Sequence, residues 1–252
     1  MADDDTQREA VRAVAENVAD RLEDEKEYLT DLDSAIGDAD HGANMSRGFR
    51  AAADTVADAD DAEPADLVKQ VGTTLISEVG GASGPLYGGS IMSASQAFAD
   101  EGITAETSVD FAEAYLDKVK DRGDARIGAK TMVDALTPAV HTYKKSIEQD
   151  DLPPLTALAK AVDAAERGVE FTMPIRAEKG RASYLGWRSV GHQDPGATST
   201  LYIMEELLAT AQEYVEGEIE RDATAVEEPD EDPTDVAEDG ADSDADDEGD
   251  AR

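Results

Sequence analysis

The sequence predicts an all-α protein, an antiparallel up-and-down barrel or bundle of about eight helices with its ligand-binding loops at one end. Apolar residues recur at three- and four-residue spacing through most of the chain, which is the period of an amphipathic helix. No segment shows the two-residue alternation that is typical of a strand. Short connections favour antiparallel neighbours, so consecutive helices should run in opposite directions.

Four helices are expected in the first half of the chain. Valines and a leucine at helical spacing mark 11–22, and a second apolar stripe over 45–56 follows a stretch rich in aspartate. A third stripe, 67–79, leads into a run of glycines. The fourth expected helix, 85–98, opens with a proline, which is favoured in the first turn because its missing N–H has no partner there.

Four more helices are expected in the second half. Apolar residues at helical spacing predict helices over 111–119, 132–143 and 155–169, and a final one over 197–215. From 222 to 252 the chain is almost entirely Asp, Glu, Ala, Pro and Gly, with too little apolar surface to offset the entropy of ordering. The sequence therefore predicts a folded domain over 1–221 and a disordered acidic tail over 222–252.

The chain is strongly acidic. It has 59 Asp and Glu against 22 Lys and Arg, a formal net charge of −37. The tail carries 15 acidic residues and one basic residue, which leaves −23 on residues 1–221. Charge of this density repels itself unless salt screens it, which favours a halophilic protein, and it argues against nucleic acid or anionic membranes as partners. The tail is expected to serve solubility in salt, with a docking role as the alternative.

Composition also predicts where the protein works. There is no cysteine, so disulfides and thiol chemistry are excluded, and this fits a cytoplasmic protein. The acidic N-terminus does not resemble a signal peptide, and no apolar run approaches the roughly 18 residues that a membrane span needs.

An acidic loop over residues 33–44 is the first candidate site. Asp38, Asp40 and a histidine lie between two glycines, Asp33 lies four residues before the first of these glycines, and no single helical face aligns the three carboxylates. Hard oxygen ligands without thiols suit Mg²⁺, which usually completes its octahedron with phosphate and water. A solvated acidic surface is the alternative. An EF-hand is excluded, because the twelfth position of either possible loop is Gly42 or Phe49 where a glutamate is required.

A glycine loop over residues 80–89 is the second candidate. Glycines allow the backbone to approach a phosphate closely, Ser83 adds a hydroxyl, and the helix expected after Pro85 supplies the positive end of its dipole. The loop is neither a Walker motif nor a dinucleotide-binding fingerprint, and a flexible turn is the alternative.

A lid segment over residues 179–199 is the third candidate. It contains the only tryptophan, Trp187, and a cluster of Lys, Arg and His in a chain that is otherwise poor in these residues. Such a long, glycine-punctuated stretch is typical of a loop that covers a ligand. The alternative is an ordered crossover whose arginines offset nearby acids.

Four motifs, GDADHGANM, GGASGPLYG, GAKTMVDALTPA and GRASYLGWRSVGHQDPGATS, together resemble the nucleotide-binding L subunit of dihydroxyacetone kinase. The resemblance extends over roughly residues 6 to 215. It implies an eight-helix antiparallel barrel with nucleotide at its mouth, so 1–221 would be an ADP- and Mg²⁺-binding domain.

Motif alignment with this family implies a role for each site residue. The Mg²⁺ ligands would be Asp33, Asp38 and Asp40. The phosphate-binding residues would be His41, Gly42, Ala43 and Asn44 from the acidic loop and Ala82 and Ser83 from the glycine loop. The base and adenosine would meet Gly123, Met132, Val133, Arg181, Asp194, Pro195 and Gly196. No catalytic residue is identified beyond this Mg²⁺–nucleotide site.

The resemblance also implies a reaction. The chain lacks the domain that holds dihydroxyacetone in the family, which favours the phosphotransferase-system form built from separate subunits. A phosphohistidine phosphocarrier protein would phosphorylate tightly bound ADP, and the resulting ATP would phosphorylate dihydroxyacetone on a K subunit, a glycerone kinase activity of glycerol metabolism. Free ATP as the donor and a homodimer both stay open. The alternatives are a kinase for another acceptor, such as a fatty acid, and a non-catalytic, nucleotide-loaded protein that binds a regulator.

Overall fold

The computed structural model describes residues 3–59 and 62–219, and every regular element within them is a helix. The α-helices are α1 (Asp4–Asp24), α2 (Lys26–Ile36), α3 (His41–Ala57), α4 (Pro64–Glu78), α5 (Gly89–Ala94), α6 (Ala105–Gly123), α7 (Met132–Glu148), α8 (Pro154–Thr172) and α9 (Pro195–Tyr214). Three shorter pieces are a π-helical turn η1 (Gly84–Gly88) and the 3-10 segments η2 (Ser95–Phe98) and η3 (Arg181–Ser189). The predicted tail, 222–252, lies outside the described residues.

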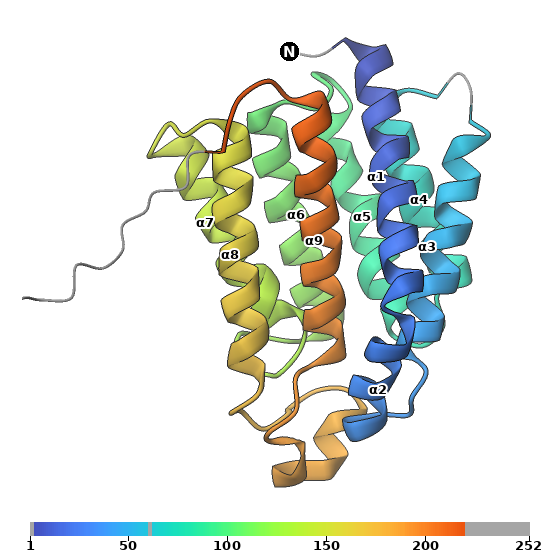
Figure 1. The fold of residues 1–252 in the computed structure, drawn as a ribbon, viewed down its shortest axis with the longest axis vertical. Helices are drawn as coiled ribbons and strands as arrows, with labels where there is room; N and C mark the ends of the chain where they lie inside the picture. Colours follow the sequence, from blue (N-terminus) through green and yellow to red (C-terminus); the bar gives the residue numbers. More distant parts are fainter. Residues whose placement is uncertain (1–2, 60–61, 220–252) are drawn as a thin grey trace, which may run out of the picture. The chain divides into compact units, whose positions relative to one another are not determined.

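Eight of the α-helices form a closed ring. Packing follows the order α1, α3, α4, α5, α6, α7, α8, α9, and α9 returns to pack against α1, as Figure 1 shows. Two polar contacts join the last helix to the first: Asn17 donates to Thr210 over 2.9 Å, and Arg21 lies 3.3 Å from Glu205. The predicted all-α, antiparallel barrel is therefore confirmed.

The helix count differs from the prediction because α2 was not anticipated. The first expected helix ends at Asp24, and the chain turns at Glu25 (φ −92°, ψ 6°) into a second helix that lies outside the ring. Leu29 and Ile36 are the buried apolar residues of α2, so its stripe is short and merges in the sequence with the acidic loop.

The fourth expected helix, 85–98, is three pieces in the structure: η1, α5 and η2. Glycines cause the irregular start, because this segment passes very close to α4. A Cβ added at Gly88 would lie 2.5 Å from the carbonyl oxygen of Gly72, and one added at Gly72 would lie 2.4 Å from the backbone nitrogen of Met92. The predicted start is correct, since Pro85 lies in the first turn of η1.

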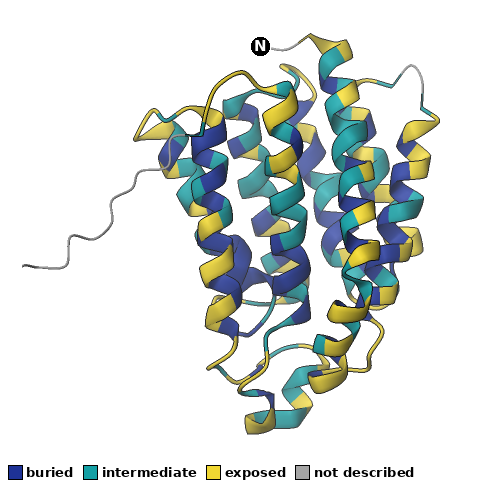
Figure 2. Ribbon diagram, in the orientation of Figure 1, coloured by how far each residue is buried: buried dark blue, intermediate teal, exposed yellow. Residues whose placement is uncertain are grey.

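The core fills the interior of the ring (Figure 2). Its larger part runs from α1 to α7, and a second part made mostly of small residues lies between α7, α8 and α9. These helices approach closely: a Cβ at Gly168 would lie 2.3 Å from the carbonyl oxygen of Asp134. Helix α8 is thereby held tightly against the start of α7.

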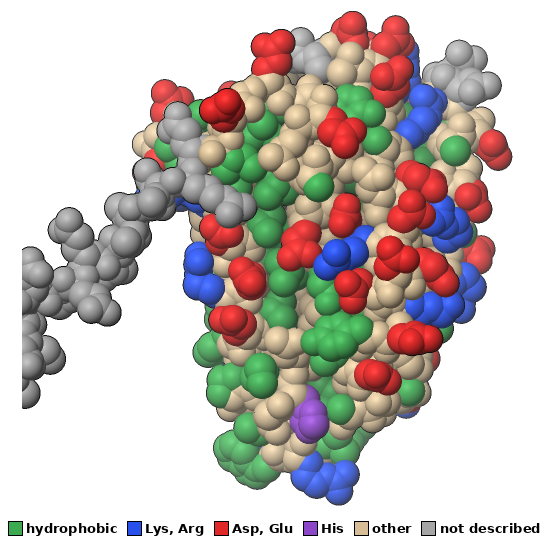
Figure 3. Space-filling model, in the orientation of Figure 1, with side chains coloured by type: hydrophobic (Ala, Val, Ile, Leu, Met, Phe, Trp, Pro, Cys, Tyr) green, Lys and Arg blue, Asp and Glu red, His purple; other side chains and the backbone are tan. Residues whose placement is uncertain are grey.

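The connections that contain the acidic loop, the glycine loop and the lid segment lie at the same end of the ring, beside α2 and η3 (Figure 1). Acidic side chains spread over much of the face in Figure 3, while apolar and histidine side chains lie toward this loop end. Within residues 3–59 and 62–219, no helix is long and apolar enough to cross a bilayer.

Candidate metal and nucleotide site

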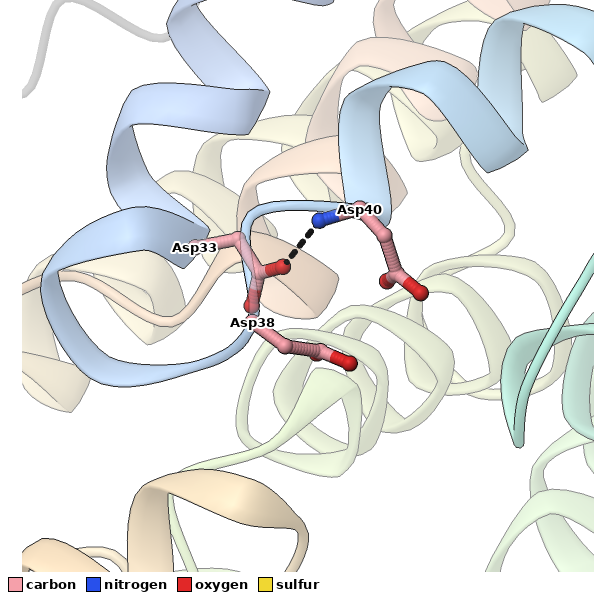
Figure 4. A group of neighbouring side chains, drawn as sticks. All are labelled: Asp33, Asp38 and Asp40. Carbon is pink, nitrogen blue, oxygen red and sulfur yellow. Dashed lines mark hydrogen bonds between the residues drawn. The ribbon is translucent and has the colours of Figure 1, made fainter.

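The three carboxylates of the acidic loop converge in the structure. Asp33 belongs to the last turn of α2, Asp38 to the connection, and Asp40 directly precedes α3. Each offers an oxygen, and these oxygens lie within 4.8 Å of one another (Figure 4). Asp33 is buried, and its Oδ2 accepts hydrogen bonds from the backbone N–H groups of Asp40 (2.9 Å) and His41 (3.2 Å). One carboxylate therefore shapes the loop that presents the other two.

Local backbone geometry explains this fold of the loop. A Cβ at Gly37 would lie 1.9 Å from Oδ1 of Asp33, so a larger residue would displace that carboxylate. Ala39 adopts a left-handed conformation (φ 63°), which turns the chain back toward α3. A Cβ at Gly42 would lie 2.1 Å from the carbonyl oxygen of Lys26, so the start of α3 packs directly on α2.

These residues fit a hard divalent cation. Opposite ligands of an octahedral Mg²⁺ lie about 4.2 Å apart, because each bond is about 2.1 Å long. The carboxylate oxygens of Asp33, Asp38 and Asp40, which lie within 4.8 Å of one another, have a spacing close to that distance. The first turn of α3 adds N–H groups without partners inside the helix, at Gly42 and Ala43, which favour anions at the same place.

The lid segment reaches this cluster through Arg181. Its Nε lies 2.7 Å from Oδ2 of Asp38, and both side chains retain solvent exposure. The chain around Arg181 forms 3-10 turns, broken at Gly186 (φ 56°, ψ −126°), although no helix was expected there. A second contact comes from Tyr28 of α2, whose hydroxyl donates to Gln193 over 3.3 Å. The lid segment thus lies against the acidic loop.

The glycine loop lies beside the start of α3. A Cβ at Gly80 would lie 2.9 Å from Oδ1 of Asn44, so these two predicted phosphate-binding segments are in contact. Gly81 has a positive φ of 66° with open space around its α-carbon, and Ala82 next to it is exposed. Ser83 directly precedes the π-helical turn, a geometry that is frequent at functional sites. An anion here can meet both the loop and the α3 N-terminus.

A buried hydrogen-bond network lies behind these loops. Nε2 of His41 lies 2.9 Å from Oγ of Ser199, which in turn lies 2.9 Å from the hydroxyl of Tyr87. Tyr87 also donates to the carbonyl of Gly196 (2.9 Å) and lies 3.0 Å from Oγ1 of Thr200. The network therefore joins α3, the end of the glycine loop and the start of α9.

Burial sets the protonation of this network. It lowers the pKa of His41, against the opposing charges of Asp33 and Asp40, and so favours the neutral form of the ring. Burial also raises the pKa of Tyr87 to about 12. The ring of His41 bonds Ser199 and the carbonyl of Pro195, so its side chain faces the interior and not the solvent side of the acidic loop.

The residues expected at the base form the other side of the site. A Cβ at Gly123 would lie 3.4 Å from Leu86, so the end of α6 meets the glycine loop. Met132 and Val133 are buried in the first turn of α7 and belong to the core. Gly196 lies beside Met132, since its Cβ would be 3.7 Å from the Met132 nitrogen. The structure therefore brings the predicted site residues to one end of the ring, from five separate segments.

Sequence reasoning missed several residues that shape this site. Tyr87, Ser199 and Thr200 form the buried network, and Lys130 is enclosed beneath the lid segment. Tyr87 and Lys130 lie inside the quoted motifs GGASGPLYG and GAKTMVDALTPA. The presence of a lysine and a tyrosine within glycine-rich motifs was the sequence signal that could have pointed to them, but the residues with which they pair are distant in sequence.

Comparison with known proteins places the chain in a family. A sequence model of the DAK2 domain matches residues 35–209, from the acidic loop to α9. The chain belongs to the DAK2 domain family.

This DAK2 chain is 45% identical over 190 residues to the ADP-binding subunit DhaL of the PEP-dependent dihydroxyacetone kinase of Escherichia coli (strain K12), covering 75% of the chain and 90% of that relative. It is 38% identical over 192 residues to the ADP-binding subunit DhaL of the PTS-dependent dihydroxyacetone kinase of Lactococcus lactis subsp. lactis (strain IL1403), covering 75% and 90%. These matches confirm the resemblance that the four motifs indicated.

A solved structure shares the fold. The dihydroxyacetone kinase from C. freundii, in complex with AMP-PNP and Mg²⁺, superposes on the DAK2 chain with a TM-score of 0.61 at 26% identity. The match covers 79% of the chain and 33% of that protein. The DAK2 barrel therefore corresponds to one part of a larger kinase in that case.

Proposed function

We propose that this DAK2 chain is the ADP-binding subunit of a dihydroxyacetone kinase, which transfers a phosphoryl group through bound ADP and ATP to dihydroxyacetone held by a separate K subunit. The observation that carries the proposal is the convergence of Asp33, Asp38 and Asp40 at the N-terminus of α3, directly beside the glycine loop. The DhaL relatives, named as ADP-binding subunits and matched over 90% of their length, support it.

Each part of the site has a distinct role in this proposal. The N–H groups of Gly42 and Ala43 and the backbone of Ala82 and Ser83 bind phosphate oxygens, which explains why helix starts and glycines meet here. Mg²⁺, held by the three aspartates, would neutralise charge on the phosphates as the phosphoryl group moves. Arg181 lies beside Asp38, where a cation can also meet the phosphates.

The adenosine end lies between α6, α7 and α9 in the proposal. Gly123 and the first turn of α7, at Met132 and Val133, meet the base, and the Asp194–Gly196 turn meets the sugar. Because the Met132 and Val133 side chains are largely buried, they offer the base a small apolar edge and backbone groups rather than a broad surface.

The partners follow from what the site provides. We propose that a phosphohistidine phosphocarrier protein rephosphorylates ADP in place and that the K subunit docks at the loop end, in glycerol metabolism in the cytoplasm. The K subunit would meet the lid segment, where Trp187 is 77% exposed. A homodimer of this chain is a further proposal, which a measurement of its mass in solution tests.

The charge pattern supports a halophilic setting. The folded domain, proposed as 1–221, retains −23 without the acidic tail at 222–252. Salt at molar concentration shortens the Debye length to about 3 Å and would screen this repulsion. We therefore propose that the tail serves solubility in salt.

The site is tested by calorimetric titration of ADP in the presence of Mg²⁺. We expect Asp38→Asn to weaken ADP binding by more than about tenfold, because even the groups that only hydrogen-bond to metal ligands are worth roughly 10- to 100-fold in metal affinity. The matched control is Asp31→Asn, which removes the same charge from an exposed position on α2. Equal ADP affinity in Asp38→Asn and Asp31→Asn would refute the metal assignment.

The reaction is tested by mixing the chain with K subunit, dihydroxyacetone and either phosphocarrier protein or ATP. When the phosphocarrier is the donor, dihydroxyacetone phosphate should form only if ADP is present, and an amount of ADP far below that of the product should suffice. Absence of product with both donors, from a chain that retains ADP, would exclude the kinase function.

A further inference from the structure

Lys130 is a lysine enclosed by protein near the adenosine end of the proposed site. It lies in the α6–α7 loop (124–131), two residues before α7, and is 1% exposed. Its backbone is left-handed (φ 61°), a conformation that few residues other than glycine adopt. A buried ammonium is costly unless its donors are satisfied, so its partners should reveal its role.

The ammonium of Lys130 joins two distant segments. Nζ donates to the carbonyl of Thr172 over 2.6 Å, to that of Ile175 over 3.4 Å, and to that of His192. Thr172 is the last residue of α8, where the negative end of the helix dipole favours a cation. His192 lies in the lid segment, two residues before Asp194. One side chain therefore ties the end of α8 to the lid segment.

The loop that carries Lys130 is itself fixed from α7. The carboxylate of Asp134 accepts hydrogen bonds from the backbone N–H groups of Gly128 and, over 2.8 Å, of Thr131. Asp134 is 1% exposed, so this anchor is internal. Lys130 is thus held at a defined position relative to the first turn of α7.

Asp194 completes the connection to α9. Its N–H donates to Oγ1 of Thr172 over 3.0 Å, and its Oδ2 accepts from the N–H of Ala197 over 2.8 Å, which caps the helix. Lys130 attracts the charges of both Asp134 and Asp194. Three segments meet around one ammonium: the α6–α7 loop, the end of α8 and the start of α9.

We infer that Lys130 is a positioning residue for the adenosine end of the nucleotide site, holding the Asp194–Gly196 turn beside the first turn of α7. Gly196 and Met132 are adjacent there, with 3.8 Å from the Gly196 Cβ position to the Met132 Cβ. Lys130 acts through the His192 carbonyl of the lid segment and does not touch the ligand, since it is enclosed. The inference rests on the proposed function only for the identity of the ligand as ADP. That Lys130 holds the Asp194–Gly196 turn in position does not depend on it.

The substitution that tests this is Lys130→Met, which keeps a similar length and removes the charge and all three donors. ADP and inorganic pyrophosphate, each with Mg²⁺, are titrated by calorimetry. We expect ADP affinity to fall by more than about tenfold and pyrophosphate affinity to change by less than about twofold, because pyrophosphate has no adenosine to meet the Asp194–Gly196 turn. A merely structural role would weaken both ligands equally, and that result would overturn the inference.

Lys144→Met is the matched control. Lys144 lies on α7, about three turns beyond its start and so away from the acidic and glycine loops, and it pairs with Glu113 over 2.8 Å. Both affinities should be unchanged in it. If Lys130→Met does not fold, Thr172→Val is the second variant, because it removes the hydroxyl that accepts a hydrogen bond from the Asp194 N–H. It should show the same selective loss of ADP affinity in a milder form. An unchanged ratio of ADP affinity to pyrophosphate affinity would then count against the inference.

Hydrogen exchange separates this inference from the proposed function. Lys130→Met should speed exchange of the amides over 192–198 and leave those of 40–46 unchanged, whatever the ligand is. If the unsubstituted chain binds no ADP, the proposed function fails while the exchange result still decides whether Lys130 positions the turn. Unchanged exchange over 192–198 would refute the positioning role.

Discussion

Replacing Tyr87 with phenylalanine should destabilise the fold by about 1–2 kcal/mol, because one buried hydroxyl has a net value of roughly 0.5–1.5 kcal/mol per hydrogen bond. The hydroxyl is within 3.0 Å of three partners and the residue is 2% exposed. The loss is limited because Thr200 also donates to the Gly196 carbonyl (2.8 Å) and Ser199 keeps its contact with His41. The ring stays, with its edge contact to Phe49 at 6.3 Å between centroids.

Thermal unfolding followed by circular dichroism measures this loss. For a domain of this size, each kcal/mol lowers Tm by about 2–4 °C, so the expected decrease is about 2–8 °C. Because the hydroxyl bonds Gly196 and Ser199, Tyr87→Phe should also loosen the turn at the adenosine end and weaken ADP binding in calorimetry.

The control is Tyr143→Phe, which removes a hydroxyl bonded to Ser108 away from the loop end. It should lower Tm without changing ADP affinity. A Tm of Tyr87→Phe within about 1 °C of the parent would refute the energetic argument, since that is below the change expected for even one lost hydrogen bond. A lower Tm with unchanged ADP affinity would refute the link between the network and the site.

Three further predictions concern protonation, docking and salt. Burial raises the pKa of Asp194 from 3.8 to about 7. The stability that the protonated carboxyl contributes to the fold is therefore fully present below pH 3.8 and is lost as the pH rises through about 7. Asp194→Asn should therefore flatten the fall of Tm between about pH 5 and pH 7; an unchanged slope would contradict the shift. Trp187→Ala should leave Tm and ADP affinity unchanged, because the side chain is exposed, but should weaken binding of the K subunit by more than about 1 kcal/mol, as expected for an interface anchor. Normal K-subunit affinity in calorimetry would remove Trp187 from the interface. Deleting 222–252 should leave helicity and phosphoryl transfer intact in molar salt, yet the truncated chain should unfold in millimolar salt, because −23 remains on 1–221. A truncated chain that keeps its circular dichroism spectrum in millimolar salt would count against the halophilic proposal.

The barrel could be predicted from sequence because its signal is local and repeated. Apolar periodicity marked the ring helices, and three aspartates within eight residues marked the acidic loop. Helix α2 escaped because its apolar stripe is short and Asp33, a residue of the acidic loop, belongs to it. The segment 85–98 was wrong in detail because its breaks are caused by contact with Gly72 of another helix.

The interior of the site could not be predicted for the same reason. Lys130 meets the His192 carbonyl 62 residues away, and Tyr87 meets Ser199 over a separation of 112. Neither residue type at its own position indicates such a partner, since the pairing depends on how α7, α8 and α9 pack. Predictions from motifs therefore reached the residues of the proposed site and stopped at the residues that hold them.

The closure of the ring by α9 against α1 has a consequence for how the protein is made. Asn17 and Thr210 are 193 residues apart, so the first helix leaves the ribosome long before its final neighbour exists. Contacts of such large sequence separation form late, because a long loop must close first. The start of α9 carries Asp194 and Ser199, so the proposed adenosine end is assembled in that same last step. Nascent chains should consequently acquire nucleotide only once α9 has emerged, and an interrupted chain that lacks α9 should expose the apolar interior of an open ring.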